Sequence, residues 1–376
     1  MTNSKKGNES TIMKHQKNIF KTAVKVLIAL FLALFVIVLG YFAYVLLTYS
    51  RIEDKQALEV TGNADRTLVP EPGREYTAVS YNIGFGAYTP DFTFFMDEGK
   101  QSRAASKESV IECITGSAKK ALEYEPDFVL FQEVDTDATR SYHVNQVEMI
   151  DDLFEGYDHI MAIDYNSAYL MYPITEPHGA SKSSILTQSR FPVTSSLRRS
   201  LPISKGLKKL LDLDRCYSVS RIPTADGKEL ILINTHLSAY GVEKGQGNAQ
   251  LEMMFADMKA EYEKGNYVVC GGDLNHDFTG DSRNVLNPGA DRTYSWCHSF
   301  PDELVPEGFS KCDNYAEGLV STSRYTNIPY SKDSFTVVLD GFIVSDNVTC
   351  TYVQNENTDY VYSDHNPVLM KFKLGQ

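Results

Sequence analysis

The longest hydrophobic pattern in this chain is an unbroken apolar run near its N-terminus. From Val26 to Thr48 no residue carries a charge, and apolar side chains cover every face of a helix. At about 1.5 Å per residue, such a helix is long enough to cross a bilayer core of about 30 Å. A cleaved signal peptide has a shorter apolar core and a small-residue cleavage site, and neither is clear here. The pattern therefore predicts an uncleaved transmembrane helix over 26–48.

Beyond residue 75 the pattern changes to short apolar runs separated by polar stretches. Runs typical of strands occur at 76–82, 128–131, 183–186, 229–236, 267–270, 335–340 and 368–372. Helical spacing of apolar residues occurs at 106–124 and 248–264. The two kinds of element do not alternate as strictly as in a doubly wound fold. We therefore predict an α/β domain in which sheets pack together with helices outside.

The distribution of charge indicates how the chain is divided and oriented. Six lysines precede the apolar run, at positions 5, 6, 14, 17, 21 and 25. Such a bias favours a cytoplasmic N-terminus, with everything after about residue 50 on the outer side. Residues 49–74 are polar and contain Pro70, Pro72 and Gly73, which is typical of a linker. The predicted organisation is a cytoplasmic tail at 1–25, a membrane anchor at 26–48, a linker at 49–74 and a folded domain at 75–376.

Charge and cysteine content indicate which partners the outer domain suits and whether its cysteines form disulfides. The net charge is −13 although the N-terminal region is basic, so the outer domain is strongly acidic and does not suit a general polyanion binder. The six cysteines show no CxxC or Cys/His metal spacing. Disulfides are permitted outside the cell, and we predict a Cys297–Cys312 pair because these residues flank a loop-like stretch. Cys270 lies in an apolar run and is expected to be a buried free thiol.

Polar residues follow the strand-like runs at a recurring position. Five runs end in residues able to bind a metal or a phosphate, and a sixth is preceded by such a pair; these residues are Asn82, Glu133, Asn234 with His236, Asp273 with Asn275, Asp340, and the pair Asp364 and His365. One such ending is ordinary turn chemistry. Six of them, with no spacing typical of a catalytic Cys or Ser, indicate a single site held on rigid strand ends.

The chemistry that these residue types suit is attack of water on a phosphate ester. Glu133, with Asp364 or Asn82, offers the oxygen ligands that Mg²⁺ or Mn²⁺ prefers. His365 is the candidate base, and Asp340 is the candidate to orient its other ring nitrogen. Two further donors for the phosphoryl oxygens are expected at Asn275 and His236. The sequence thus predicts a metal-dependent hydrolase.

At these residues the sequence resembles the endonuclease/exonuclease/phosphatase superfamily of metal-dependent phosphoesterases, which includes deoxyribonucleases, sphingomyelinases and inositol phosphatases. The matching segments, in family order, are 80–82, 132–133, 234–237, 272–275, 339–342 and 363–368. The resemblance implies a four-layer α/β/β/α sandwich of two mixed sheets flanked by helices, with the site at one end of the sheets. The family would make the 75–376 domain catalytic.

The same resemblance implies a role for each residue. Glu133 would be the main metal ligand, with Asn82 and Asp364 close by. The residues Asp273 and Asn275 would position water or the transition state, His236 would bind phosphate, and Asp340 with His365 would form the orienting pair. Whether His365 or Asp273 acts on the water stays open.

Three residues after Glu133 are candidates for contact with the substrate. Arg140, Tyr142 and Asn145 lie on a polar segment, and a bidentate Arg suits phosphate. The alternative for Arg140 is a solvated loop residue. We predict a monomeric, membrane-anchored enzyme that hydrolyses a lipid or small-molecule phosphate outside the cytoplasm. Two alternatives remain: an extracellular nuclease with the same site, and an inactive surface binding protein that keeps the fold.

Overall fold

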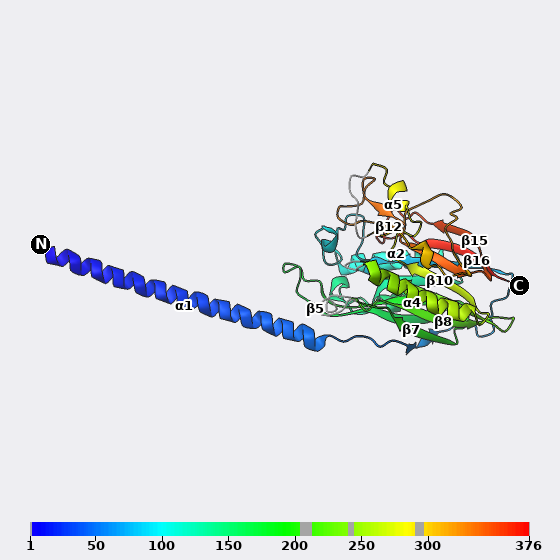
Figure 1. Ribbon diagram of the computed structural model, residues 1–376, viewed down its shortest axis with the longest axis horizontal. Coiled ribbons are helices and arrows are strands. Elements are labelled where there is room, and N and C mark those ends of the chain that lie inside the picture. The colour runs from blue at the N-terminus through cyan, green and yellow to red at the C-terminus, as the bar shows by residue number, and fades with distance from the viewer. Residues whose placement is uncertain (1, 204–212, 240–243, 290–296, 376) are drawn as a thin grey trace. The chain divides into compact units, whose positions relative to one another are not determined.

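A computed structural model describes residues 2–203, 213–239, 244–289 and 297–375, and they form two compact units (Figure 1). The first unit, Met1–Tyr49, is built on one helix, α1, which spans Thr2–Thr48. Within α1 the stretch Met13–Thr48 is long and apolar enough to cross a membrane. The helix begins well before the predicted anchor at 26–48, and the lysine-rich segment that precedes the anchor contains no proline to end it.

The second unit, Ser50–Gln376, contains two mixed sheets of seven strands. In the first sheet (sheet A) the order is β1 (Gln56–Leu58), β7 (Ser195–Ser200), β8 (Cys216–Pro223), β9 (Glu229–His236), β10 (Tyr267–Asp273), β14 (Asp340–Ser345), β11 (Phe309–Lys311). In the second (sheet B) it is β15 (Val348–Asn355), β16 (Val368–Leu374), β3 (Glu75–Asn82), β4 (Phe128–Asp135), β6 (Gly179–Ser189), β5 (Asp158–Leu170), β2 (Val60–Gly62). A small ribbon pairs β12 (Ser323–Arg324) with β13 (Thr336–Val337).

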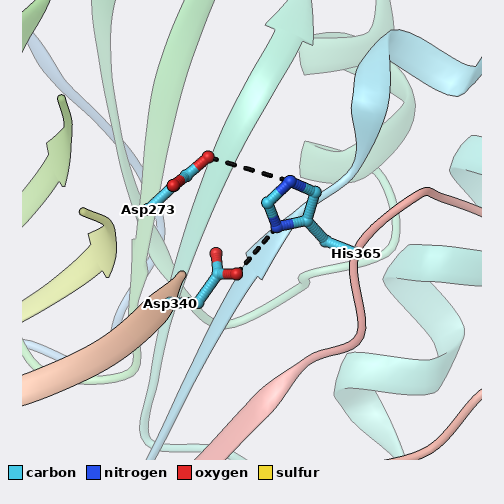
Figure 2. A group of neighbouring side chains, drawn as sticks. All are labelled: Asp273, Asp340 and His365. Carbon is cyan, nitrogen blue, oxygen red and sulfur yellow. Dashed lines mark hydrogen bonds and ion pairs between the residues drawn. The ribbon is translucent and has the colours of Figure 1, made fainter. Parts of the chain in front are cut away.

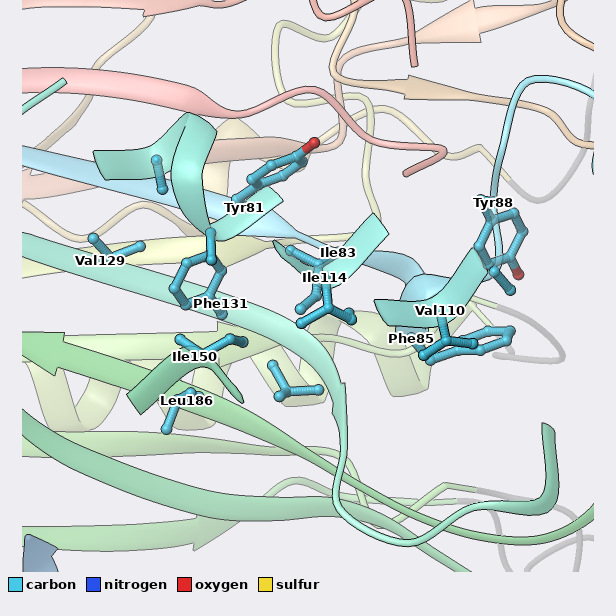
Figure 3. Close-up of a cluster of buried hydrophobic side chains, with 14 of the residues drawn as sticks. Tyr81, Ile83, Phe85, Tyr88, Val110, Ile114, Val129, Phe131, Ile150 and Leu186 are labelled. Carbon is cyan, nitrogen blue, oxygen red and sulfur yellow. The ribbon is translucent and has the colours of Figure 1, made fainter. Parts of the chain in front are cut away.

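Alternation of side chains along the strands creates the layers. On β3 and β4, Ala78 and Phe128 belong to a core shared with Leu232 and Val269 of sheet A, so this cluster lies between the sheets. The intervening residues, such as Val129 and Phe131, pack instead on the outer face of sheet B (Figure 3). They contact the helices α2 (Lys107–Leu122) and α3 (Gln146–Asp151).

The outer face of sheet A is covered by α4 (Lys244–Tyr262), whose Leu251, Met254 and Met258 pack on Ile231 and Val268. A short helix, α5 (Ser282–Val285), lies farther along the chain. The predicted α/β/β/α sandwich of two mixed sheets flanked by helices is therefore confirmed.

Two expectations from the sequence are wrong. Residues 49–74 are not a linker throughout, because β1 pairs with β7 and β2 pairs with β5. Strands of three residues add to a sheet edge through backbone hydrogen bonds, and so short a run shows no hydrophobic period.

The predicted Cys297–Cys312 disulfide is absent, since both thiols are free and belong to different hydrophobic clusters.

Candidate active site

Strand pairing brings the predicted site residues to one end of the sandwich. In sheet A, β9 and β10 run parallel, and their final residues His236 and Asp273 lie side by side. The antiparallel strand β14 begins opposite Asp273 with Asp340. In sheet B, β3 and β4 are parallel, so that Asn82 lies beside Gln132 and next to Glu133. Residues that are far apart in sequence therefore meet because parallel strands end at the same edge.

The imidazole of His365 is held between two carboxylates (Figure 2). Its Nδ1–H donates to Asp340 Oδ2 over 2.7 Å, and its Nε2 faces Asp273 Oδ2 at 3.8 Å. Burial disfavours the imidazolium, but the charge and the hydrogen bond of Asp340 outweigh burial and raise the pKa of His365 to about 10. Because Nδ1 is engaged by Asp340, only Nε2 is directed toward Asp273 and the site.

A second group of contacts joins the two sheets at Asp273. Asn82 Nδ2 donates to Asp273 Oδ2 over 3.0 Å and lies 3.4 Å from Glu133 Oε1. The Nε2 of the fully buried His236 lies 3.4 Å from Asp273 Oδ2 and 3.9 Å from Glu133 Oε1. This Nε2 has no hydrogen-bond partner in the described part of the chain. A buried ring nitrogen that faces two carboxylates and lacks a partner is suited to contact a ligand in the site.

Glu133 lies in a β-bulge of β4, where its φ is 55°. A non-glycine residue in the left-handed region is strained, and such strain is commonly found at functional sites. Its side chain is 22% exposed, so it stays open to solvent beside buried neighbours. Asn275, which follows β10, also has a positive φ, of 48°, and its amide donates to the Leu237 carbonyl over 2.8 Å.

Asp364 adds another carboxylate to this end of the sandwich. Burial raises its pKa to about 7 and the negative charge of Glu133 adds to the effect, while His365 and Arg324 oppose it. A bound cation stabilises the ionised form of a carboxyl group whose pKa is raised in this way. Oxygen and nitrogen atoms of Asp273, Asp340 and His365 also lie within 4.8 Å of one another, close enough to hold an ion. The donor set therefore fits a hard divalent cation.

The three residues expected to contact substrate all make contacts within the protein. Arg140 is buried and forms a two-pronged ion pair with Asp135, with its guanidinium 3.8 Å from the centre of the Phe85 ring. Tyr142 donates its hydroxyl hydrogen to the Ala104 carbonyl over 3.1 Å. Asn145 caps α3 by accepting from the backbone N–H of Glu148. Contact of Arg140, Tyr142 and Asn145 with a substrate stays a prediction.

The structure also places residues at the site that sequence reasoning missed. Asp164 Oδ2 lies 3.1 Å from His236 Nδ1 and 2.9 Å from an Arg215 nitrogen, so these two residues support the buried histidine from behind. Burial opposes ionisation of Asp164, yet its hydrogen bond with His236 and the Arg215 charge bring its pKa to about 2. Asp164 lies on β5 and Arg215 directly precedes β8, and only the folded structure reveals their contact with His236.

Arg324 is a further residue that no sequence signal marked. It is 2% exposed, and its Nη2 donates to the Thr89 carbonyl over 2.9 Å. Its Nε and Nη1 have no hydrogen-bond partner among the described residues. Its charge acts on Asp364, the carboxylate next to His365. A buried guanidinium with two unused donors is a candidate for binding an anion at the site.

Comparison with known proteins gives the family. A sequence profile of the Endonuclease/Exonuclease/phosphatase family matches residues 79–365, which include every strand end of the site. The chain therefore belongs to the endonuclease/exonuclease/phosphatase family of hydrolases acting on phosphate esters. No curated protein matches the chain in sequence.

Solved structures share the fold at low sequence identity. The chain is similar to ANGEL2, a 2′,3′-cyclic phosphatase, in complex with adenosine-2′,3′-vanadate, with 14% identity, a TM-score of 0.53 and 87% and 100% of the two chains covered. It is also similar to an endonuclease/exonuclease/phosphatase from Bacteroides vulgatus, with 16% identity, a TM-score of 0.52 and coverage of 80% and 99%. The human nocturnin catalytic domain matches with 14% identity, a TM-score of 0.50 and coverage of 84% and 97%.

Proposed function

We propose that this protein is a membrane-anchored phosphoesterase that depends on a divalent cation and acts outside the cytoplasm. The observation that carries the proposal is the meeting of carboxylates and imidazoles from both sheets at one point, centred on Asp273. No simple turn chemistry requires such a meeting, whereas hydrolysis of a phosphate ester requires acidic ligands, a proton acceptor and donors together. The family assignment supports the same reaction class.

Roles follow from the contacts of each side chain. Glu133, with Asn82 and Asp364, would hold Mg²⁺ or Mn²⁺, which when bound neutralises charge on the phosphate oxygens. The attacking water would lie at the gap between Asp273 and His365 Nε2. The Asp273 carboxylate would take its proton, because an imidazole with a pKa of about 10 is already protonated at neutral pH, and His365 would donate a hydrogen bond. The side chain of Asp340 fixes the ring of His365.

The developing charge on the phosphoryl group needs hydrogen-bond donors. The unpartnered Nε2 of His236 is directed at the carboxylates of the site, and Asn275 lies at the end of β10 beside it. A cavity of about 230 Å³ adjoins Asn275 and is lined by His276, His298 and Phe300. Such a space would accommodate part of the alcohol that leaves when the ester is cut.

Two features support a lipid or another substrate at a membrane surface. The apolar stretch of α1 follows a lysine-rich segment, and by the positive-inside bias this order supports a cytoplasmic N-terminus. The hairpin between β5 and β6 extends past the end of β4, on the side of the site, and exposes Met171, Tyr172 and Ile174, with Ile174 86% exposed. An exposed apolar tip of this kind suits contact with a bilayer.

The proposal is tested with the full chain in detergent micelles against a phosphodiester, a phosphomonoester, phospholipid vesicles and plasmid DNA. We expect turnover with Mg²⁺ or Mn²⁺ that stops on addition of EDTA and is lost in His365→Ala. Turnover of the phospholipid alone would support the membrane-surface substrate, and nicking of the plasmid would make the protein a nuclease with the same site. A folded protein that cuts none of these substrates would contradict the proposed activity and favour a binding protein.

A further inference from the structure

Two cysteines lie at the same open edge of the sandwich, on different sheets. Cys312 follows β11, the edge strand of sheet A, and its backbone N–H donates to the Phe342 carbonyl over 2.8 Å. Cys350 lies on β15, the edge strand of sheet B, opposite Phe372 of β16. Strands β14 and β15 follow each other directly in the chain, so the two edges are brought together at this side of the domain.

The two side chains share one environment. Cys312 is 3% exposed in the core between the sheets, and Cys350 is a partly buried residue packed against the same core. The Cys312 sulfur lies 3.5 Å from the Met370 sulfur of β16, and the Cys312 and Cys350 thiols interact with each other. Both are free. Cys297, the partner expected from the sequence, lies in a separate cluster.

Solvent can reach this pair through a cavity. A space of about 350 Å³ is lined by both cysteines, together with Lys311, Asp313 and Tyr352. The interaction with the Cys312 thiol lowers the pKa of Cys350, the more exposed of the two. A thiolate is the nucleophile in thiol–disulfide exchange, so Cys350 is the residue that would react first.

We propose that Cys312 and Cys350 form a disulfide that links the edge strands of the two sheets, with a low-molecular-weight disulfide as the oxidant. The Cys350 thiolate attacks one sulfur of the oxidant, which forms a mixed disulfide and releases one thiol. Cys312, losing its proton, then attacks the Cys350 sulfur and releases the second thiol. The two cysteines lose two electrons and two protons, and the oxidant is reduced to two thiols.

The bond would stabilise the sandwich at its open edge. The disulfide would close a loop of about 40 residues. Closing this loop lowers the conformational entropy of the unfolded chain, which should raise the melting temperature by about 5 °C in a domain of this size. The active site lies at the ends of the strands and does not include either cysteine. The inference therefore stands apart from the proposed function, and its test does not use catalytic activity.

The test uses the full chain in detergent, equilibrated with either oxidised or reduced glutathione. Trypsin cleaves after Lys311, Arg324, Lys332 and Lys371, so Cys312 and Cys350 fall on separate peptides, each with one cysteine. We expect mass spectrometry without reduction to show peptides 312–324 and 333–371 linked after oxidation. We also expect the oxidised protein to melt about 5 °C above the reduced protein.

Variants distinguish the proposed bond from other oxidation. In Cys350→Ser the linked peptides and the melting shift should both vanish, while Cys312→Ala should leave Cys350 as a mixed disulfide with glutathione. Cys297→Ser, also at a buried cysteine, should keep both signals. The comparison of oxidised with reduced wild-type protein needs no substitution, because reduction alone should remove the linked peptides and the melting shift. A variant that fails to fold therefore does not block the test. Absence of the 312–350 link after oxidation, or a melting shift that persists in Cys350→Ser, would overturn the proposal.

Discussion

The pair formed by Asp340 and His365 allows a sharp test of the proposed chemistry. In Asp340→Asn the shape of the side chain is kept and its charge is removed. The bond it affects is 2.7 Å long and joins a carboxylate that is 0% exposed to an imidazole that is 5% exposed. The backbone N–H of residue 340, which donates to Thr322 Oγ1 over 3.1 Å, is unchanged by the substitution. The variant should therefore fold, and the substitution should affect only the orientation and protonation of the His365 imidazole.

The expected loss can be worked out from this bond. A hydrogen bond to a charged group contributes about 1.5–3 kcal/mol, and each 1.4 kcal/mol or so is a factor of ten in rate. An asparagine can also donate to Nδ1 and so favour the wrong tautomer of His365. Loss of a positioned acid or base typically costs about 10²–10⁴-fold. We expect kcat to fall by about 10²-fold or more, with KM nearly unchanged because binding of the phosphate uses other residues.

The assay measures kcat and KM across pH on a phosphodiester that the wild-type protein cuts, at saturating Mg²⁺. Asp333→Asn is the matched control, since Asp333 is exposed in a loop and loses the same charge. Circular dichroism and thermal melting establish that both variants are folded. If folded Asp340→Asn kept its kcat within about threefold of the wild type, the reasoning that a fixed imidazole takes part in the reaction would be refuted.

Three further predictions concern the cation and the strand edges. Glu133→Gln should weaken Mn²⁺ binding, measured by calorimetry, by about 10- to 1,000-fold, because one charge near the ion is worth about 1–4 kcal/mol. Since the pKa of Asp364 is raised from 3.8 to about 7, the cation-free native domain binds more protons than the unfolded chain between these values. Its stability should therefore fall as pH rises toward about 7, and Mn²⁺ affinity should rise over the same range and then level off. Gly272→Ala should lower the melting temperature strongly, because a Cβ there would lie 2.0 Å from the Thr235 carbonyl oxygen, whereas Gly227→Ala meets no atom within 4 Å and should cost only about 1 kcal/mol of strain.

Controls separate these effects from general damage. Glu155→Gln removes a charge from an exposed position and should leave Mn²⁺ affinity unchanged. When saturating Mn²⁺ is present at every pH, the fall of stability with pH that is assigned to Asp364 should disappear, since the ion keeps that carboxyl ionised. Unchanged Mn²⁺ affinity in Glu133→Gln, a flat affinity profile between pH 5 and about 8, or equal melting temperatures of the two glycine variants would each contradict the corresponding argument.

Much of the fold was predictable because hydrophobic periods are local. The run at 267–270 indicated β10 and the spacing at 248–264 indicated α4, since a buried strand and a half-buried helix each leave a characteristic pattern. The edge strands β1 and β2 were missed because they have three residues each and bury little. The long strand β5 was missed as well, since exposed residues interrupt its apolar pattern.

By itself, the sequence determined which residue types end the strands, and with the family resemblance it named Glu133, Asp273 and His365 before any geometry was known. Tertiary structure decided what surrounds them, because the partners of a side chain come from other strands and are set by pairing and register. Only the folded chain placed Asp164 and Arg215 behind His236, or brought the Cys312 thiol beside that of Cys350 and away from Cys297. These contacts join residues of different sheets. Hydrophobic periodicity shows only which face of one element is buried, so it cannot show which residues of the other sheet lie against that face.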